Sequence, residues 1–314
     1  INAGGSHIYE PFFNEIMDQV IDPETGVSIK ERKYAQSVVN AEKSGRGKLM
    51  GNRNMKQSAL GAGSDWGGFL QHLGISSFNM GYGGESEGDQ YHSTYDSYDF
   101  FTRFIDPGFK YGVALSKTSG RTLLRLANAD VLPVDFKSFY NTINDYSTEI
   151  KAQLEKTRAE TEEETRMRKD KLYELARDPG KIYAAPPARD PVPYLNWSSL
   201  ENVLAQLKTA SDEFQQLYSK ATGLPGEKQA ALNKILYKTE RSLLQPDGLP
   251  RRPWYRHQIY APGYYTGYGV KTLPGIREAV EQRFWKEAQE NIERMAATLK
   301  AYTESIKTAS ELLK

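Results

Sequence analysis

Apolar residues recur at steps of three and four through most of the second half of the chain. The first run starts after Pro133 and consists of Phe136, Phe139, Tyr140, Ile143, Tyr146, Ile150 and Leu154. This period places the apolar side chains on one face of an α-helix. A stretch of mixed charge, KTRAETEEETRMRKDK (156–171), follows the run and predicts either a solvated continuation of the helix or a hairpin.

The same period predicts three more helices. A proline-rich stretch, residues 176–194, separates them from the first helix, because its prolines cannot be accommodated in a helix. Ser198 and Glu201 have the spacing of a capping box, which predicts that Ser198 is the N-cap of the second helix. The third helix is expected at 225–244 and the fourth from about Pro274 to the C-terminus. Four long amphipathic helices predict an antiparallel four-helix bundle.

A long irregular stretch, residues 245–275, interrupts this helical half and is dense in Pro, Gly and Tyr. A long loop inside a compact domain is usually functional, although an ordered surface loop pinned by packing of Pro and Tyr is the alternative. The fourth helix after it is expected to be unbroken, because Ile276, Val280, Phe284 and later apolar residues keep to one stripe.

The first 134 residues have a different pattern, with short apolar stretches and most of the glycines outside the tail. A helix end, a turn at Gly74 and a strand at 75–80 are predicted in LQHLGISSFNMGYGG. One long helix is expected after Pro107, packed through Val113, Leu123 and Leu124 among others. Helix, strand, loop and helix in this order indicate the last part of an α/β domain.

The fold class is therefore α/β plus all-α, with an α/β part at 1–134 and a helical domain at 135–314. A chain of 314 residues with 39% apolar and 26% charged residues is long and apolar enough for both. The net charge of +1 argues against a nucleic-acid or membrane-surface binder, and no apolar run is long enough for a transmembrane segment. The absence of cysteine excludes disulfides, thiolate metal sites and cysteine nucleophiles.

Candidate chemistry centres on a histidine in the stretch GDQYHSTYDSYD. The four histidines of the chain are His7, His72, His92 and His257. None lies three or four residues from another, so no local motif forms a complete metal site. Next to His92, Tyr91 could orient a ligand and Asp96 could hold the second imidazole nitrogen. The local sequence favours a histidine hydrogen-bonded among aromatic residues and leaves a metal ligand open.

Two long segments resemble a known family. They are residues 88–136, from GDQYHSTYDSYDFF to LANADVLPVDF, and DGLPRRPWYRHQIYAP at 247–262. Both closely resemble the glutamate carboxypeptidase II family of di-zinc exopeptidases, which is related to the transferrin receptor. The resemblance extends to GAGSDWGGFLQHLGISS (61–77) and to the final helix. It implies that 1–134 is the last part of a zinc-peptidase domain and that 135–314 is a dimerisation domain.

The resemblance implies that His92 occupies the position of the last zinc ligand of the family. Family members bind two zinc ions with an activated water between them and use a glutamate as the general base. Their other ligands and that glutamate precede the segment that INAGGSHIYEPF resembles. We therefore expect this chain to contain one zinc ligand and no general base. We also expect that the chain alone is catalytically inactive.

The resemblance also implies substrate-binding positions. Gly63 and Ser64 match a loop that lines the substrate pocket. Tyr268 matches a tyrosine that contacts the carboxylate of a C-terminal glutamate, and the loop 245–275 is expected to reach the active site. Tyr91, which could orient a ligand, is also predicted to bind the substrate.

Three positions depart from the family pattern. Asn79 and Gly81 stand where the mammalian enzyme has arginines that favour acidic residues, and Gly267 stands where it has a lysine. Because none of the three is basic, a preference for acidic residues and for a C-terminal glutamate is in doubt.

The resulting hypothesis is the C-terminal part of a zinc-dependent exopeptidase that acts on peptides and forms a homodimer through its helical domain. A non-catalytic, receptor-like assembly module is one alternative, and an aminopeptidase of the same di-zinc family is another. The lack of cysteine and the outward-facing habit of the family indicate an exported protein, periplasmic or extracellular.

Overall fold

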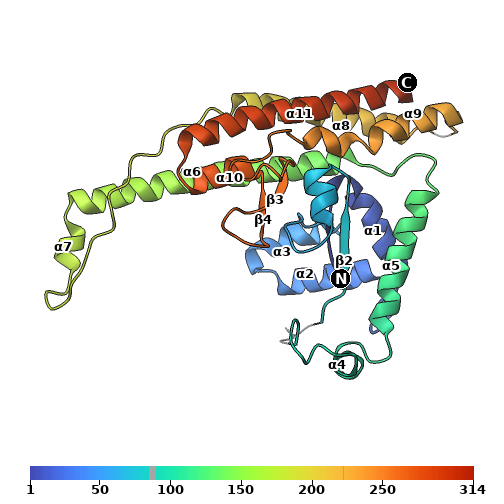
Figure 1. Cartoon of the computed structure of the whole chain (residues 1–314), viewed down its shortest axis with the longest axis horizontal. Helices are drawn as coiled ribbons and strands as arrows, with labels where there is room; N and C mark the ends of the chain where they lie inside the picture. Colours follow the sequence, from blue (N-terminus) through green and yellow to red (C-terminus); the bar gives the residue numbers. More distant parts are fainter. Residues whose placement is uncertain (85–89, 222) are drawn as a thin grey trace.

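The computed structural model describes residues 1–84, 90–221 and 223–314, and it is mostly helical with two small sheets. Long helices lie along one side of the molecule, and the N-terminal residues form a second part beneath them (Figure 1). The elements of the N-terminal part are β1 (Asn2–Gly5), α1 (Glu10–Gln19), α2 (Ile29–Asn40), α3 (Lys43–Met50), β2 (Phe78–Gly81), α4 (Tyr98–Phe100) and α5 (Lys110–Ala127), with short helical turns η1 (His7–Tyr9), η2 (Gly67–His72) and η3 (Phe101–Ile105).

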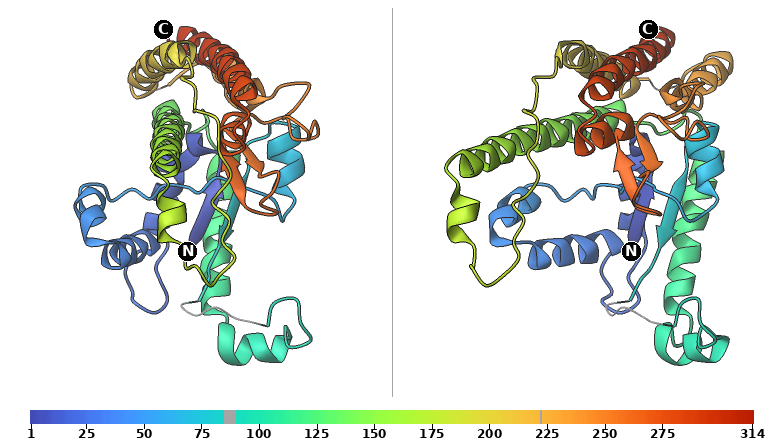
Figure 2. Two further views of the ribbon diagram at one scale, coloured as in Figure 1. Left: turned by 90° about the vertical axis from the view of Figure 1, so that its left-hand side faces the viewer. Right: turned by 60° about the vertical axis from the view of Figure 1, so that its left-hand side comes forward.

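The remaining elements form the helical part and a hairpin. They are α6 (Phe136–Lys169), α7 (Leu172–Ala176), α8 (Ser198–Tyr218), α9 (Gly226–Leu236), η4 (Thr239–Leu243), β3 (Tyr260–Pro262), β4 (Val270–Thr272), α10 (Pro274–Glu281) and α11 (Trp285–Leu313). The two sheets, β1–β2 and β3–β4, are both antiparallel and lie beneath the long helices (Figure 2). Within these described ranges, no helix is both long enough and apolar enough to cross a membrane.

The strand predicted at 75–80 begins later, at Phe78, and pairs with β1 so that Gly5 lies opposite Phe78 and Asn2 opposite Gly81. The predicted turn at Gly74 is confirmed by its φ of +63°. Ser77 lies just beyond the end of the ladder, where its carbonyl still accepts the Ser6 backbone N–H at 3.1 Å.

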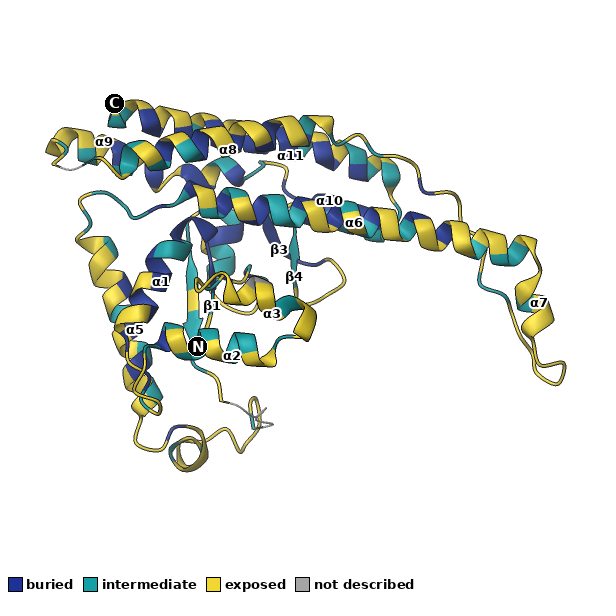
Figure 3. Ribbon diagram, turned by 180° about the vertical axis from the view of Figure 1, so that it is seen from behind, coloured by how far each residue is buried: buried dark blue, intermediate teal, exposed yellow. Residues whose placement is uncertain are grey.

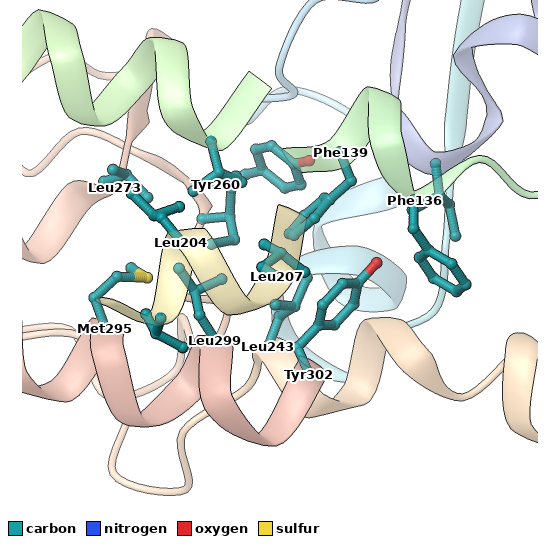
Figure 4. Close-up of a cluster of buried hydrophobic side chains, with 14 of the residues drawn as sticks. Phe136, Phe139, Leu204, Leu207, Leu243, Tyr260, Leu273, Met295, Leu299 and Tyr302 are labelled. Atoms are coloured by element: carbon teal, nitrogen blue, oxygen red, sulfur yellow. The ribbon is translucent and has the colours of Figure 1, made fainter. Parts of the chain in front are cut away.

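Helix α6, α8 and α11 pack together through large apolar side chains. Figure 4 shows Phe139 of α6, Leu207 of α8 and Tyr302 of α11 converging on one core, and the rings of Phe139 and Tyr302 lie 4.5 Å apart. Burying an aromatic residue of this size contributes about 1.5–3 kcal/mol. This core confirms the apolar faces predicted for α6 and α8.

The predicted antiparallel arrangement of the bundle is only partly right. Lys137 at the start of α6 pairs with Asp212 late in α8, and Lys151 further along α6 pairs with Glu201 at the start of α8, so these two helices are antiparallel. In contrast, Gln289 near the start of α11 accepts a hydrogen bond from Asn196, just before α8, and Lys314 at the end of α11 pairs with Glu213 near the end of α8. α8 and α11 are therefore parallel, because α9, η4, the hairpin and α10 return the chain to the starting end.

The predicted extents of the third and fourth helices were wrong. The third helix ends at Leu236 and is followed by the separate turn η4, so it does not fill 225–244. The fourth is broken between α10 and α11, where Arg283 has a φ of +59° and Phe284 is 47% exposed instead of continuing the apolar stripe. The guanidinium of Arg251 lies 5.4 Å from the Phe284 ring centroid, which gives this exposed ring a partner outside the core.

The predicted capping box at Ser198 is also wrong. Trp197 is the N-cap of α8, and the Ser198 backbone N–H donates to the side-chain oxygen of Asn196 at 3.0 Å. Glu201 pairs with Lys151 on α6 instead of reaching back to its own helix start. The Asn196 side chain therefore caps the start of α8, and Glu201 forms a tertiary ion pair instead of the predicted capping box.

The charged stretch 156–171 continues α6 as a helix as far as Lys169, so the hairpin alternative is wrong. The end of α6, α7 and the following loop form an arm that projects from the body and is largely exposed (Figure 3). Arg158 fixes the return of this arm: its guanidinium donates to the Pro193 carbonyl at 3.0 Å and lies 4.1 Å from the Tyr194 ring.

The long helix predicted after Pro107 is confirmed as α5, but its packing face was predicted wrongly. The buried residues are the small side chains Ala114, Thr118 and Thr122, whereas Leu123 and Leu124 are 68% and 62% exposed. Each buried threonine donates to the carbonyl four residues earlier, which satisfies its hydroxyl inside the core.

Replacing Gly120 in the interior of α5 with alanine is expected to raise the free energy of unfolding by about 0.5–1 kcal/mol. A Cβ at this position meets nothing within 4 Å, so the gain in helix propensity comes without a clash. Chemical denaturation measures the change, and a destabilised variant would contradict it.

One cluster of buried apolar residues joins both parts of the chain. Ile8, Phe12 and Leu70 belong to the same cluster as the core of the long helices. Val134 and Phe136, on either side of the predicted boundary, are both buried in it. The division into domains at 134/135 stays a prediction, and the two parts share a core.

Candidate functional site

Two loops from distant parts of the sequence meet at the candidate site. The backbone N–H of Ala62 donates to the carbonyl of Tyr268, in the loop between β3 and β4, at 3.1 Å. Gly61 allows this approach, since a Cβ there would lie 2.1 Å from the Tyr268 oxygen. Gly63 has a φ of +114°, and a Cβ on it would lie 3.4 Å from the Tyr268 ring. Glycines at 61 and 63 therefore let the two loops touch.

This contact brings together four of the predicted substrate-binding residues. Gly63 and the adjacent Ser64 lie on one loop, and Gly267 and Tyr268 lie on the other. Gly267 adopts the left-handed conformation, with a φ of +58°, and Tyr268 is 77% exposed. The Tyr268 hydroxyl is thus available to a ligand at the junction of the two loops.

Helix α10 holds the hairpin in place. The Tyr264 backbone N–H donates to the carboxylate of Glu278 at 2.6 Å, and Lys271 pairs with Glu281 at 2.7 Å. Arg252 pairs with Glu278 and donates to the Pro262 carbonyl at 2.7 Å. These bonds fix the position of the loop that carries Tyr268.

Asn79 and Gly81 lie on β2, opposite Gly4 and Asn2 of β1. Asn79 is exposed. Among the described residues, no hydrogen bond or ion pair joins either of them to the two loops. The structure therefore places these two candidates in the N-terminal sheet and does not connect them to Tyr268.

His92 lies in an exposed turn, and its ring stacks on Tyr91 with 3.8 Å between the ring centroids. Its φ of +61° is uncommon for a residue other than glycine. Asp96 is in the same turn, where its backbone N–H donates to the Ser93 carbonyl at 3.1 Å, and no bond from Asp96 to His92 is seen in the described ranges. Those ranges hold no group of three His, Asp or Glu side chains that could bind a metal ion. The zinc-ligand role of His92 stays a prediction.

A buried polar network supports the hairpin, and no sequence pattern predicted it. His257 is fully buried, and its Nδ1 accepts the backbone N–H groups of Ile259 and Tyr260, each at 3.2 Å. Nε2 therefore carries the proton and donates to Glu240 at 3.0 Å. Ser76 donates to the other oxygen of Glu240, also at 3.0 Å. The network links the segment before β2, η4 and the base of the hairpin.

A second buried histidine, His7, lies next to this network. Its Nε2 is 3.1 Å from the Tyr146 hydroxyl, and its ring packs edge-on against Tyr260. Burial lowers the pKa of the His7 imidazole to about 4, an effect that the negative charge of Glu240 opposes. His7 is therefore neutral in the folded protein at pH 7.

The lowered pKa of His7 predicts a loss of stability in weak acid. Because the unfolded histidine has a pKa near 6.5, the unfolded state binds the proton first as the pH falls from about 6.5 to about 4. The stability is present above pH 6.5, and about 2 kcal/mol should be lost between pH 7 and pH 5. Urea denaturation at the two pH values measures this loss.

The matched variant for this test is His7→Phe, which keeps an aromatic ring against Tyr260 and removes the titrating group. It should lose less stability than the natural chain between pH 7 and pH 5, whatever its stability at pH 7. An equal loss in both proteins would assign the effect to other groups.

Comparison with known proteins gives a family. Residues 195–307 match the family model of the transferrin receptor-like dimerisation domain. A probable glutamate carboxypeptidase of Arthroderma benhamiae is 30% identical over 240 residues, which are 75% of this chain and 28% of that protein. The chain belongs to the glutamate carboxypeptidase and transferrin-receptor-like family. The expectation from the sequence is confirmed at this level.

Other relatives of this family carry two kinds of peptidase name. A probable glutamate carboxypeptidase of Arabidopsis thaliana is 28% identical over 247 residues, or 76% of this chain and 30% of that protein. An aminopeptidase of Rattus norvegicus is 27% identical over 226 residues, or 70% of this chain and 26% of that protein. The chain thus spans less than a third of the length of these three relatives. The dimerisation match begins at 195, after α6 and the arm, so it covers only the later part of 135–314.

Proposed function

We propose that this chain supplies the C-terminal part of a zinc-dependent exopeptidase. The observation that carries the proposal is the junction of the two loops, where Ala62 and Gly63 meet Tyr268 in a member of a family whose relatives are named as peptidases. The exposed Tyr268 hydroxyl can donate to the carboxylate of a bound peptide. The fixed hairpin would hold that hydroxyl in place.

For zinc, His92 is a suitable single ligand, because its imidazole is exposed and its ring is oriented by Tyr91. Two bound zinc ions would activate a water and stabilise the oxyanion that forms in peptide hydrolysis. The remaining ligands and the general base would come from parts of the protein outside this chain. Accordingly, we propose that the chain alone is inactive, and zinc-dependent peptidase activity of the purified chain would contradict this.

The test of the function uses the full-length protein with His92→Ala. We expect this variant to retain less zinc, measured by metal analysis, and to lose at least about 100-fold in peptidase activity, because one ligand of the activating metal is missing. His72→Gln is the control, since it removes a histidine that is not a predicted zinc ligand, and it should keep its zinc. Unchanged zinc content and activity in His92→Ala would refute the ligand role.

An aminopeptidase is the second candidate, favoured by the similarity to the rat protein with that name. A panel of peptides with blocked N-termini or blocked C-termini separates the two activities in the full-length protein. An exopeptidase that needs a free C-terminus supports the carboxypeptidase, and one that needs a free N-terminus supports the aminopeptidase. If the full-length protein cleaves neither kind of peptide and binds no zinc, the result would favour the non-catalytic, receptor-like module.

We also propose that the chain forms a homodimer through its helical part. The match to a dimerisation domain at 195–307 supports this arrangement. Light scattering should give twice the mass of the chain. A strictly monomeric chain at high concentration would count against it.

A further inference from the structure

A pocket of about 620 Å³ lies beside the loop junction. Its walls are the loop before η2, the first turn of η2 with Gly67 and Gly68, and the segment at Trp254 and Tyr255. Its size is typical of sites for small ligands or single side chains. η2 itself is a π-type turn, a rare geometry that occurs often at functional sites.

Gln71 contributes an unpartnered acceptor to this pocket. Its side chain is fully buried, and its Nε2 donates to the carbonyls of Leu60 at 2.9 Å and Gly61 at 2.5 Å. These two acceptors fix the orientation of the amide, because the flipped form would place Oε1 against both carbonyls. Oε1 therefore points the other way and has no hydrogen-bond partner within the described part of the chain.

A glycine lies close to that oxygen. A Cβ on Gly67 would lie 3.5 Å from Gln71 Oε1, so this neighbour adds no side chain next to the acceptor. A Cβ on Gly68 would have no other atom within 4 Å. Oε1 is buried in the structure, so a ligand can reach it only if the atoms that cover it move. A buried acceptor without a partner costs about 1–3 kcal/mol, which a ligand donor would recover.

The other groups of the pocket select the charge of the ligand. Asp65 is exposed on the wall, and its carboxylate forms no ion pair within the described ranges. Trp254 is 49% exposed and is held by stacking on His72, whose Nδ1 lies 2.8 Å from the Trp254 carbonyl. A carboxylate, a lone acceptor and an indole all favour a cationic donor and disfavour an anion.

We propose that this pocket binds an organic cation, the ammonium or guanidinium group of a basic side chain. The cation pairs with Asp65, packs against the indole of Trp254 and donates to Gln71 Oε1. Because Gly63 and Ser64 also line the pocket, the natural ligand is a basic residue of a peptide. That last identification rests on the proposed peptidase function, whereas the binding of the cation does not.

The first test measures binding to the whole chain in the presence of a metal chelator. The probes are the N-acetyl amides of lysine, arginine, norleucine and glutamic acid. Their binding is observed through shifts of the tryptophan indole N–H signals in NMR spectra. Trp254→Phe assigns the signal that belongs to the pocket. Lysine and arginine derivatives should shift this signal, and the norleucine derivative, which has no charge, should bind about tenfold more weakly. Equal binding of norleucine, tighter binding of the glutamic acid derivative, or no binding of either cation would overturn the proposal.

The second test uses matched variants with the lysine derivative. Asp65→Asn, an exposed and nearly isosteric change, should weaken binding about three- to fivefold. Asp130→Asn, an exposed carboxylate that does not line the pocket, is the control and should leave binding unchanged. Equal affinity of Asp65→Asn and the natural chain would overturn the role of the carboxylate. Because no zinc is present, these outcomes stand apart from the test of peptidase activity.

Discussion

Replacing His257 with alanine is expected to lower the free energy of unfolding by about 3–5 kcal/mol. The change removes the donor to Glu240 and the acceptor of two backbone N–H groups. Water cannot replace these partners, because His257 is fully buried and Glu240 is 3% exposed. Glu240 would keep only the hydrogen bond from Ser76. Equilibrium denaturation at pH 7 measures the loss.

The control for this result is His72→Ala, at a partly exposed histidine, for which a loss of about 1 kcal/mol or less is expected. A double-mutant cycle with Glu240→Gln then isolates the pair. Because the neutral amide is less costly to leave buried, the two changes together should cost less than the sum of the single changes. Additive losses would show that the two side chains are not coupled.

The second large effect is expected from Gly61→Ala. The new Cβ would lie 2.1 Å from the Tyr268 carbonyl oxygen and 2.9 Å from the Val270 nitrogen, and backbone atoms cannot rotate away as a side chain can. The loops must therefore separate, at a cost of about 2–3 kcal/mol in the free energy of unfolding. Hydrogen exchange at the Ala62 amide, which donates to Tyr268, should accelerate by at least about tenfold.

Gly68→Ala is the matched control, because it adds the same methyl group where nothing lies within 4 Å. It should leave both the stability and the protection of the Ala62 amide near their original values. If Gly61→Ala kept that protection, the contact between the two loops would not depend on glycine at position 61.

The sequence predicted most of the helices because a buried face with a period near 3.6 is a local property. The first part of α6, as far as Leu154, and the apolar face of α8 follow from it directly, whereas the charged end of α6 was left open between a helix and a hairpin. The parallel course of α8 and α11 does not, because it depends on where the chain travels between them. The start of α8 also differs, since Asn196 caps it and Glu201 pairs with Lys151 on α6 instead of forming the predicted capping box.

The candidate site was predictable only in part, and mainly through resemblance. Gly63 and Tyr268 were both named from sequence, but their contact joins two segments that no local pattern connects. The pair of His257 and Glu240 was missed because buried polar partners follow no period along the chain. Gln71 was missed for the same reason: its isolated acceptor exists only once the surrounding backbone is in place.

The contact between Ala62 and Tyr268 also sets the order of assembly on the ribosome. Tyr268 follows Ala62 by about 200 residues in the sequence, so the loop that carries Ala62 must wait until the hairpin is synthesised before its partner appears. Domains that close early in synthesis do not have this delay. Nascent chains that stop before the hairpin should therefore leave the glycine loop open, exposed to chaperones and proteases.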